Sequence, residues 1–276
     1  MTQVAKTKNK KKLLSICLLI ASLFVLTTGC GVDQKAEKPD STEKNAIGII
    51  GAMDVEIDTL KSAANIESST EVAGMEFMKG TLGDKPVVIV KCGMGKVNAG
   101  ICANTLIHEF GCKEIINTGV AGSLDNRIDI GDIVVSTDAV QHDFDVEPIG
   151  FKRGEIPYTG KIAFEADEEM RRSAVEAIKE TVSDVKYFEG RVCSGDQFID
   201  TNEKKKAITS RFGGLCCEME GGAIAHTCYL NSTPFVIIRA ISDKEDGSAS
   251  MEYEIFQEAA ANHCAKIVEY MVEKKL

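Results

Sequence analysis

Short apolar runs alternate with amphipathic segments along most of this chain, and that alternation limits the folds it can adopt. AIGIIGA, from Ala46, has the composition of a buried strand, and the following VEIDTLKSAA has apolar residues at helical spacing. Further strands are predicted in KPVVIVKCG, EIINTGVAGS, GDIVVSTDAV, FEGRVCSGD and PFVIIRAISD, and further helices in AGICANTLIHEF, 166–181, 203–211, EGGAIAHTCYL and 251–274. Continuous apolar strands separated by helices predict one α/β domain whose sheet is covered on both faces.

The first 29 residues have the pattern of an export signal. Five lysines and no acid precede an apolar run from Leu13 to about Thr28, which is shorter than the ~20 residues of a membrane span. Small residues before Cys30 resemble the lipobox of a bacterial lipoprotein, although Thr27 stands where leucine is more usual. We expect a lipoprotein signal peptide over 1–29, lipid attachment at Cys30, a flexible polar tether over 30–45 and the folded domain over 46–276. This predicts anchoring at the outer face of the plasma membrane, with an uncleaved leader as the alternative anchor.

Charge and cysteine content exclude some classes of protein. Removal of the five leader lysines leaves 27 basic against 42 acidic residues, a net charge of −15, so we expect no nucleic-acid partner. Of the ten cysteines, eight are scattered singly through the predicted core elements beyond Cys30. We predict small buried hydrophobic residues there, with disulfides as the alternative.

Glycine-rich and cysteine-rich stretches give weak signals. CGMGKVNAG lacks the third glycine of a dinucleotide site and the Lys-Ser/Thr pair of a P-loop, so a nucleotide cofactor is disfavoured. A turn whose N–H groups face a ligand oxygen and a purely structural turn both remain open. His226 and Cys228, near Cys216 and Cys217, fit no zinc-ligand spacing, and we expect no metal.

Three carboxylates carry the strongest functional signal. Glu56, Glu220 and Asp243 each follow an apolar strand and lie among residues that should be buried. A single such acid could be a helix N-terminal charge, but three at one end of a sheet predict a functional site. One carboxylate can activate water and another can protonate a leaving group, while a third holds sugar hydroxyls; this set suits hydrolysis of a glycoside without saying which one.

Several motifs together resemble one family. IGIIGAMDVEIDTL, GMGKVNAG, IINTGVAGSL, GDIVVSTDAVQHDFDV, SGDQFI, EMEGGAIAH and PFVIIRAISD, in order from Ile47, are similar to the 5′-methylthioadenosine/S-adenosylhomocysteine nucleosidases of the nucleoside phosphorylase superfamily. The resemblance implies a three-layer α/β/α fold around a twisted mixed sheet, a homodimer and no cofactor. It also implies hydrolysis of the N-glycosidic bond of methylthioadenosine and S-adenosylhomocysteine, with 5′-deoxyadenosine as a further candidate, to adenine and a 5-thioribose.

The resemblance also implies roles for single residues. Glu56 matches the acid that activates water, Asp243 the acid that protonates N7 of the purine, and Glu220 the acid that holds the ribose hydroxyls. Met219 would pack under the sugar, Phe198 and Ile199 would contact adenine, and Met53 and Met94 would lie around the sugar and the water. Ser242 and Arg239 would support the catalytic acid and its strand. The 5′-alkylthio group would lie among Val146, Ile149, Pro157 and Tyr253, partly contributed by the dimer partner. Ile149 and Tyr253 replace a phenylalanine that is frequent in the family, which leaves the substrate preference open.

Three alternatives to a methylthioadenosine/S-adenosylhomocysteine nucleosidase remain. Phosphorylases of the superfamily place an arginine at the first strand end, where this chain has Asp54, Glu56 and Asp58, so phosphate would be repelled. An aminofutalosine nucleosidase could use the same site chemistry. A non-catalytic nucleoside-binding lipoprotein would not need both an acid and a base.

Overall fold

The computed structural model describes residues 45–244 and 249–276, so the predicted leader, Cys30 and almost all of the predicted tether lie outside the described residues. The strands are β1 (Ile47–Gly51), β2 (Asn65–Val72), β3 (Met75–Leu82), β4 (Lys85–Lys91), β5 (Glu114–Ser123), β6 (Ile133–Gln141), β7 (Ala163–Glu165), β8 (Tyr187–Ser194), β9 (Cys216–Glu218) and β10 (Phe235–Asp243). The helices are α1 (Asp54–Ala63), α2 (Lys96–His108), the short 3-10 helix η1 (Glu147–Ile149), α3 (Glu168–Thr181), α4 (Asn202–Phe212), α5 (Gly221–Asn231) and α6 (Ala249–Lys274).

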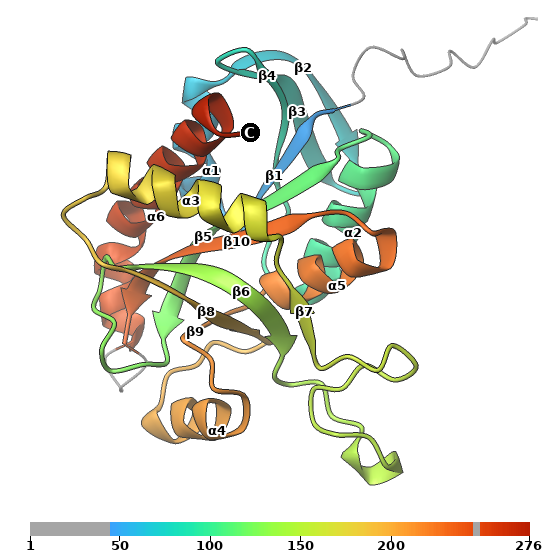
Figure 1. Ribbon diagram of the computed structural model, residues 1–276, viewed down its shortest axis with the longest axis vertical. Coiled ribbons are helices and arrows are strands. Elements are labelled where there is room, and N and C mark those ends of the chain that lie inside the picture. Colours follow the sequence, from blue (N-terminus) through green and yellow to red (C-terminus); the bar gives the residue numbers. More distant parts are fainter. Residues whose placement is uncertain (1–44, 245–248) are drawn as a thin grey trace, which may run out of the picture. The chain divides into compact units, whose positions relative to one another are not determined.

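The strands form one mixed sheet at the centre of the described body (Figure 1). Its order is β10-β6-β8-β9-β5-β1-β4-β3-β2, β7 pairs with β6, and β10 also pairs with β5. β1, β5 and β10 run parallel to one another, whereas β9 is antiparallel to β5. The carboxyl ends of β1, β5 and β10 therefore meet at one edge, where ligands gather in sheets of this kind.

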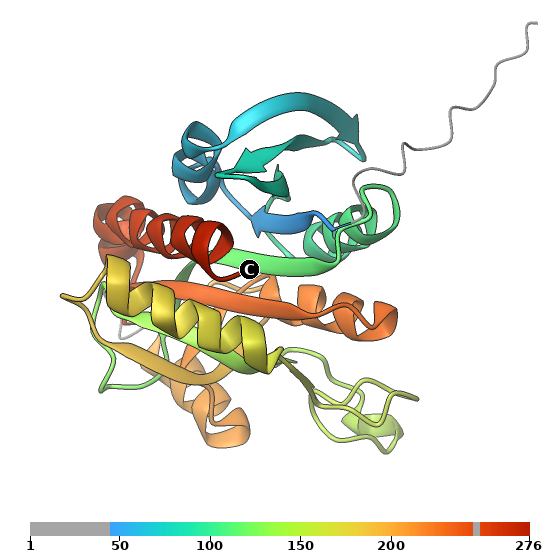
Figure 2. The same cartoon turned by 45° about the horizontal axis from the view of Figure 1, so that its top comes forward.

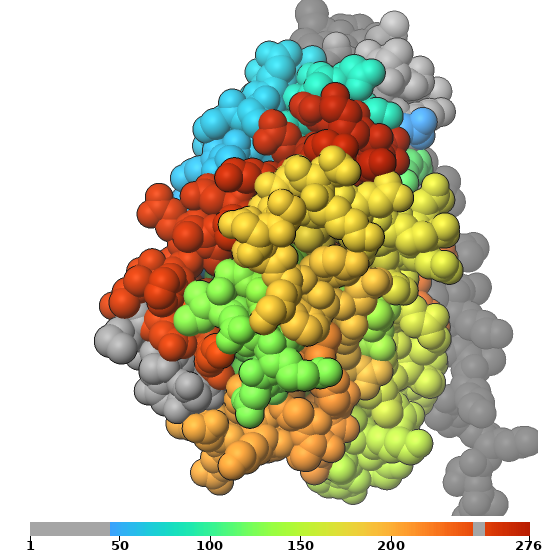
Figure 3. Space-filling model, turned by 60° about the vertical axis from the view of Figure 1, so that its left-hand side comes forward, coloured from blue at the N-terminus to red at the C-terminus, as the bar shows by residue number. Residues whose placement is uncertain are grey.

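Helices cover both faces of the sheet, as predicted. Buried residues of α1, α3 and α6 form one core with the strands, and those of α2 and α5 form a second core on the opposite face (Figures 1 and 2). α6 lies beside α3 across the surface of the first of these faces (Figure 3). This arrangement confirms the three-layer α/β/α fold with a mixed sheet.

The strands that the sequence did not predict are β2, β3, β7 and β9. β3, with the sequence MEFMKGTL, is largely buried, but Glu76, Lys79 and Gly80 interrupt its apolar residues. β2 has the sequence NIESSTEV and is largely exposed, because it is the outer strand of an antiparallel hairpin with β3. β7 and β9 have three residues each, too few to show a pattern. The final helix begins at Ala249, two residues before its predicted start.

The cysteines of the described body all lie in its interior. They come from both faces of the sheet, and Cys102, Cys228 and Cys264 are fully buried. None of the helices in the described residues is both long and apolar enough to cross a membrane. The described body thus has an ordinary packed interior to which its cysteines contribute.

Candidate active site

A cleft opens at the edge where β1, β5 and β10 end. Its empty volume is about 550 Å³, including the part open to solvent. Ten of the predicted site residues line it: Met53, Glu56, Met94, Phe198, Ile199, Met219, Glu220, Ser242, Asp243 and Tyr253. Most of the wall is apolar, so the carboxylates in it face a largely water-poor space.

Glu56 is fixed by the backbone around it. It lies in the first turn of α1, and its Oε2 accepts hydrogen bonds from the N–H groups of Ala52 (2.6 Å) and Met53 (3.1 Å). Its Oε1 accepts one from Val120 of β5 (3.0 Å). Burial raises the pKa of Glu56, although Arg239 and these three N–H groups oppose the shift. A carboxylate in this setting is a stronger base than an exposed one.

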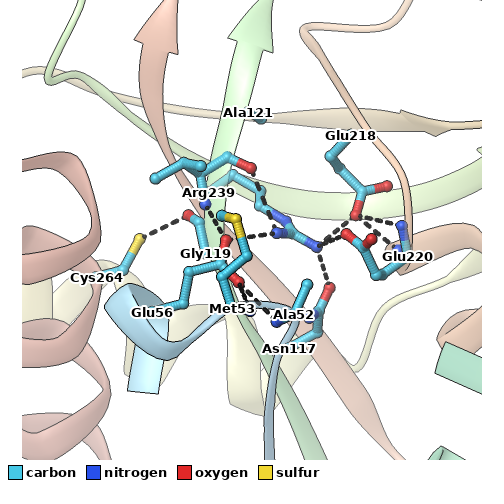
Figure 4. Close-up of polar contacts among 12 residues, drawn as sticks. Ala52, Met53, Glu56, Asn117, Gly119, Ala121, Glu218, Glu220, Arg239 and Cys264 are labelled. Atoms are coloured by element: carbon cyan, nitrogen blue, oxygen red, sulfur yellow. Dashed lines mark hydrogen bonds and ion pairs between the residues drawn. The ribbon is translucent and has the colours of Figure 1, made fainter. Parts of the chain in front are cut away.

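Arg239 lies beneath the cleft in the middle of β10 and is almost completely buried. Its Nη2 donates to Asn117 Oδ1 (2.6 Å) and contacts Glu218, while its Nη1 donates to the carbonyl of Val120 (3.3 Å). Glu56 Oε1 and Glu220 Oε2 lie 3.8 Å and 3.6 Å from the guanidinium nitrogens (Figure 4). Burial alone would lower the pKa of Arg239, but these carboxylates raise it, so the guanidinium stays charged.

Glu220 joins the cleft to the turn before α2. Its Oε1 accepts a hydrogen bond from Gly95 N–H (2.9 Å). Burial, reinforced by repulsion from Glu218, raises the pKa of Glu220 to about 7, against the opposing effects of Arg239 and Gly95. Near neutral pH, Glu220 is therefore protonated in some molecules and ionised in others. The protonated carboxyl group can donate a hydrogen bond, whereas the ionised one only accepts.

Asp243 is the last residue of β10. Its strand register against β5 shifts between Ile241 and Asp243, an irregularity of the kind that turns a side chain out of the regular alternation. The hydroxyl of Ser242 lies 2.8 Å from Asp243 Oδ1, which it can donate to. Asp243 is 2% exposed, so only the cleft gives a ligand access to it.

Two side chains close one part of the cleft wall. The hydroxyl of Tyr253 donates to the sulfur of Met53 (3.0 Å), and the rings of Phe198 and Tyr253 meet edge to face with centroids 5.8 Å apart. Among the described residues, no group of three or more His, Cys, Asp or Glu side chains is arranged to hold a metal ion.

Comparison with known proteins assigns this arrangement to a family. Residues 46–273 match the family model of the phosphorylase superfamily. The chain is 39% identical over 229 residues to the 5′-methylthioadenosine/S-adenosylhomocysteine nucleosidase of Staphylococcus aureus strain JH9, covering 83% of this chain and 99% of that protein. The chain belongs to this nucleosidase family of the phosphorylase superfamily. The predicted family is thereby confirmed.

Solved structures of similar proteins have the same fold. The nucleosidase of Neisseria meningitidis in complex with methylthio-immucillin-A is 33% identical, with a TM-score of 0.80 over 83% of this chain and 99% of that one. Futalosine hydrolase of Helicobacter pylori is 32% identical, with a TM-score of 0.79 over 84% of this chain and 98% of that one. The fold is thus shared by nucleosidases with differently named substrates.

Glu218 is a site residue of this nucleosidase-family chain that the sequence analysis missed. It lines the cleft, contacts Arg239 and Ser194 Oγ, and accepts hydrogen bonds from the N–H groups of Glu220 (3.1 Å) and Gly221 (2.7 Å). It thereby binds the free N–H groups at the start of α5 as well as the buried guanidinium. The only signal in the sequence is that EMEGG contains two acids, Glu218 and Glu220.

Three predicted residues lie away from the cleft of their own chain. Val146, Ile149 and Pro157 are on the connection between β6 and β7, and none of them lines the cavity. The side chain of Ile149 is 71% exposed. The structure of the single chain thus does not bring these three residues to the cleft.

Proposed function

We propose that this protein hydrolyses the N-glycosidic bond of 5′-methylthioadenosine and S-adenosylhomocysteine, releasing adenine and a 5-thioribose. The observation that carries the proposal is that Glu56, Glu220 and Asp243, three buried carboxylates, open into one mainly apolar cleft. Membership of the nucleosidase family supports the same reaction. 5′-Deoxyadenosine would fit the same chemistry.

In the proposed mechanism the two catalytic carboxyl groups have opposite tasks. Glu56, whose oxygens accept hydrogen bonds from three N–H groups and whose Oε1 lies 3.8 Å from Arg239, takes a proton from the attacking water. Asp243 delivers a proton to N7 of the purine, so that adenine leaves as a neutral base. Glu220 accepts hydrogen bonds from the ribose hydroxyls, which strengthen as positive charge develops on the ring.

The apolar wall supports a substrate with a large flat base and a thioether. Phe198 and Ile199 would contact adenine, and Met219 would pack under the sugar. An aminofutalosine nucleosidase is the second candidate, because futalosine hydrolase of Helicobacter pylori has the same fold. A hydrophobic slot discriminates only weakly between similar substituents, so both substrates belong in an assay.

Phosphorolysis and simple binding are less compatible with this site. Glu56 lines the cleft just after the first strand, and negative charge there repels phosphate. A protein that only binds nucleosides would gain little from burying both a base and an acid, because buried carboxyl groups are costly. The site therefore favours an enzyme that uses water.

We propose further that two copies of the chain associate. Met94, Val97 and Ile101, on or just before the outer side of α2, are 62%, 72% and 42% exposed, and Ile149 and Tyr158 add exposed apolar surface. Exposed apolar groups of this kind are typical of an interface. In such a dimer Val146, Ile149 and Pro157 would line the 5′-alkylthio pocket of the partner.

We also propose that the protein is anchored by lipid at Cys30 to the outer face of the bacterial plasma membrane. The support is the leader pattern alone: five lysines, a short apolar run and small residues before Cys30. Residues 31–45 would then act as the tether to the enzyme domain. There the enzyme would meet extracellular nucleosides.

The catalytic assignment predicts loss of turnover without loss of fold. Asp243→Asn should lower the kcat for adenine release from methylthioadenosine by at least about 100-fold, because asparagine cannot protonate the purine. Release by the unaltered enzyme should be the same with and without phosphate. Unchanged release by Asp243→Asn, or strict phosphate dependence, would contradict the proposal. Asp84→Asn, which changes an exposed acid between β3 and β4 outside the cleft, is the matched control.

The raised pKa of Glu220 predicts a pH dependence. Ribose binding needs the ionised form, so kcat/KM for methylthioadenosine should fall as the pH decreases through about 7. Glu220→Gln should remove this acid limb and lower kcat/KM at pH 8, since the amide cannot replace the charged acceptor. An acid limb that persists unchanged in Glu220→Gln would assign it to another group.

The proposed dimer predicts a concentration-dependent mass. Sedimentation of residues 46–276 at micromolar concentration should give twice the chain mass, and Ile149→Asp should shift it toward the single-chain mass because it places a charge in an apolar interface. The same variant should raise the KM for methylthioadenosine. A single-chain mass for the unaltered protein would refute the dimer.

Lipid attachment predicts labelling at one cysteine. In bacterial cells the full chain should incorporate a palmitate analogue and fractionate with membranes, and Cys30→Ser should abolish labelling. Cys17→Ser, a cysteine inside the apolar run, is the matched control and should keep the label. Recovery of the unaltered, unlabelled protein from the cytosol would overturn the anchor.

A further inference from the structure

Lys96 is an unusual residue for its position. It is the first residue of α2, where a positive charge is unfavourable because the helix N-terminus is itself partly positive, and no acid occupies the first turn. Its side chain is only 15% exposed. A largely buried ammonium group at a helix N-terminus needs a compensating interaction.

Two aspartates from different loops provide that compensation. Lys96 Nζ lies 2.5 Å from Asp143 Oδ1 and 3.9 Å from Asp196 Oδ2. The backbone N–H of Lys96 donates to Asp196 Oδ1 (2.8 Å), and the N–H of Asp196 donates to Asp143 Oδ2 (2.9 Å). These contacts join the start of α2, the loop after β6 and the loop after β8 in one closed network.

The network touches the cleft on two sides. Asp196 immediately precedes Gln197, Phe198 and Ile199, which line the cavity. Gly95, on the other side of Lys96, donates its N–H to Glu220 Oε1. Asp196 lies so close to Gly95 that a Cβ there would be 3.2 Å from Asp196 Oδ1. One turn thus holds both the base-contacting loop and the carboxylate that would bind the ribose.

We propose that Lys96 is a positioning residue, which by pairing with Asp143 and Asp196 fixes the 197–199 loop and the Gly95 N–H that binds Glu220. This rests on the proposed nucleosidase function of the cleft. Without the ammonium group the two aspartates repel each other across a partly buried space, and the loop moves away from Gly95. Burial opposes ionisation of Asp143, yet its pKa stays below the ordinary value because Lys96 and the Asp196 N–H bind the carboxylate.

The test compares Lys96→Met with the unaltered enzyme. We expect the KM for methylthioadenosine to rise about tenfold while kcat changes less than about threefold, since a positioning loss acts first on binding. Weakening of the Gly95 hydrogen bond should also move the acid limb of kcat/KM to higher pH by about half a unit. The other titratable or charged groups that interact with Glu220 are Glu218, Arg239, Glu56 and, on α6, Tyr253, and all of them are unchanged in this variant.

Further variants separate positioning from general destabilisation. Lys275→Met removes a lysine that lies just after α6 and pairs with Glu176 of α3, away from the cleft. It should change neither the KM nor the acid limb. Lys96→Arg keeps the positive charge and should therefore have a KM for methylthioadenosine close to that of the unaltered enzyme. The double variant Lys96→Met/Asp143→Asn should bind methylthioadenosine better than Lys96→Met alone, because it removes the repulsion between Asp143 and Asp196. Should Lys96→Met not fold, Lys96→Gln replaces it in every comparison.

The outcomes distinguish this inference from the proposed function. If the unaltered enzyme releases no adenine, the nucleosidase function fails, and the affinity of each variant for methylthioadenosine, measured by calorimetry, then tests the positioning role. If the unaltered enzyme is active and Lys96→Met or its Gln substitute lowers only the melting temperature, with KM and acid limb as in Lys275→Met, the positioning role of Lys96 is refuted.

Discussion

The buried guanidinium of Arg239 is the interaction on which the geometry of the site depends. It lies within 4 Å of Glu56 and Glu220 and contacts Glu218, which arrive from three different elements of the chain. Three carboxylates could not be buried so close together without this central charge, because each would repel the others in a poorly solvated space. Arg239 therefore determines how closely α1, β9 and the start of α5 approach β10.

The topology of the sheet brings these elements together. β5 pairs with β1, β10 and β9, so it contacts every strand whose end contributes an acid to the site. Its Asn117 accepts from Arg239 and donates to the carbonyl of Ile50 on β1 (3.0 Å), and its Val120 N–H binds Glu56. Gly119 has no room for a side chain, since a Cβ there would lie 2.2 Å from Glu56 Oε1.

Sequence patterns predicted the parts of the structure that repeat a strong local signal. The layers and most parallel strands followed from apolar runs, and Glu56, Glu220 and Asp243 were found because each follows such a run. Glu218 was missed because its strand has three residues, and β2 because an exposed strand carries no apolar pattern. β3 was missed although it is largely buried, because Glu76, Lys79 and Gly80 interrupt its apolar residues. The pairing of Lys96 with Asp143 and Asp196 joins residues 47 and 100 positions apart, which no local pattern records.

The balance of charge in the cleft is consistent with hydrolysis in a further way. One arginine faces Glu56, Glu218 and Glu220, so carboxyl groups outnumber the buried guanidinium in the cleft. Such a surplus of negative charge repels phosphate but stabilises a sugar that becomes positively charged as its bond to the base breaks. It also accounts for the pKa of about 7 at Glu220, because burial and the nearby Glu218 both disfavour a further negative charge until a positively polarised ligand enters.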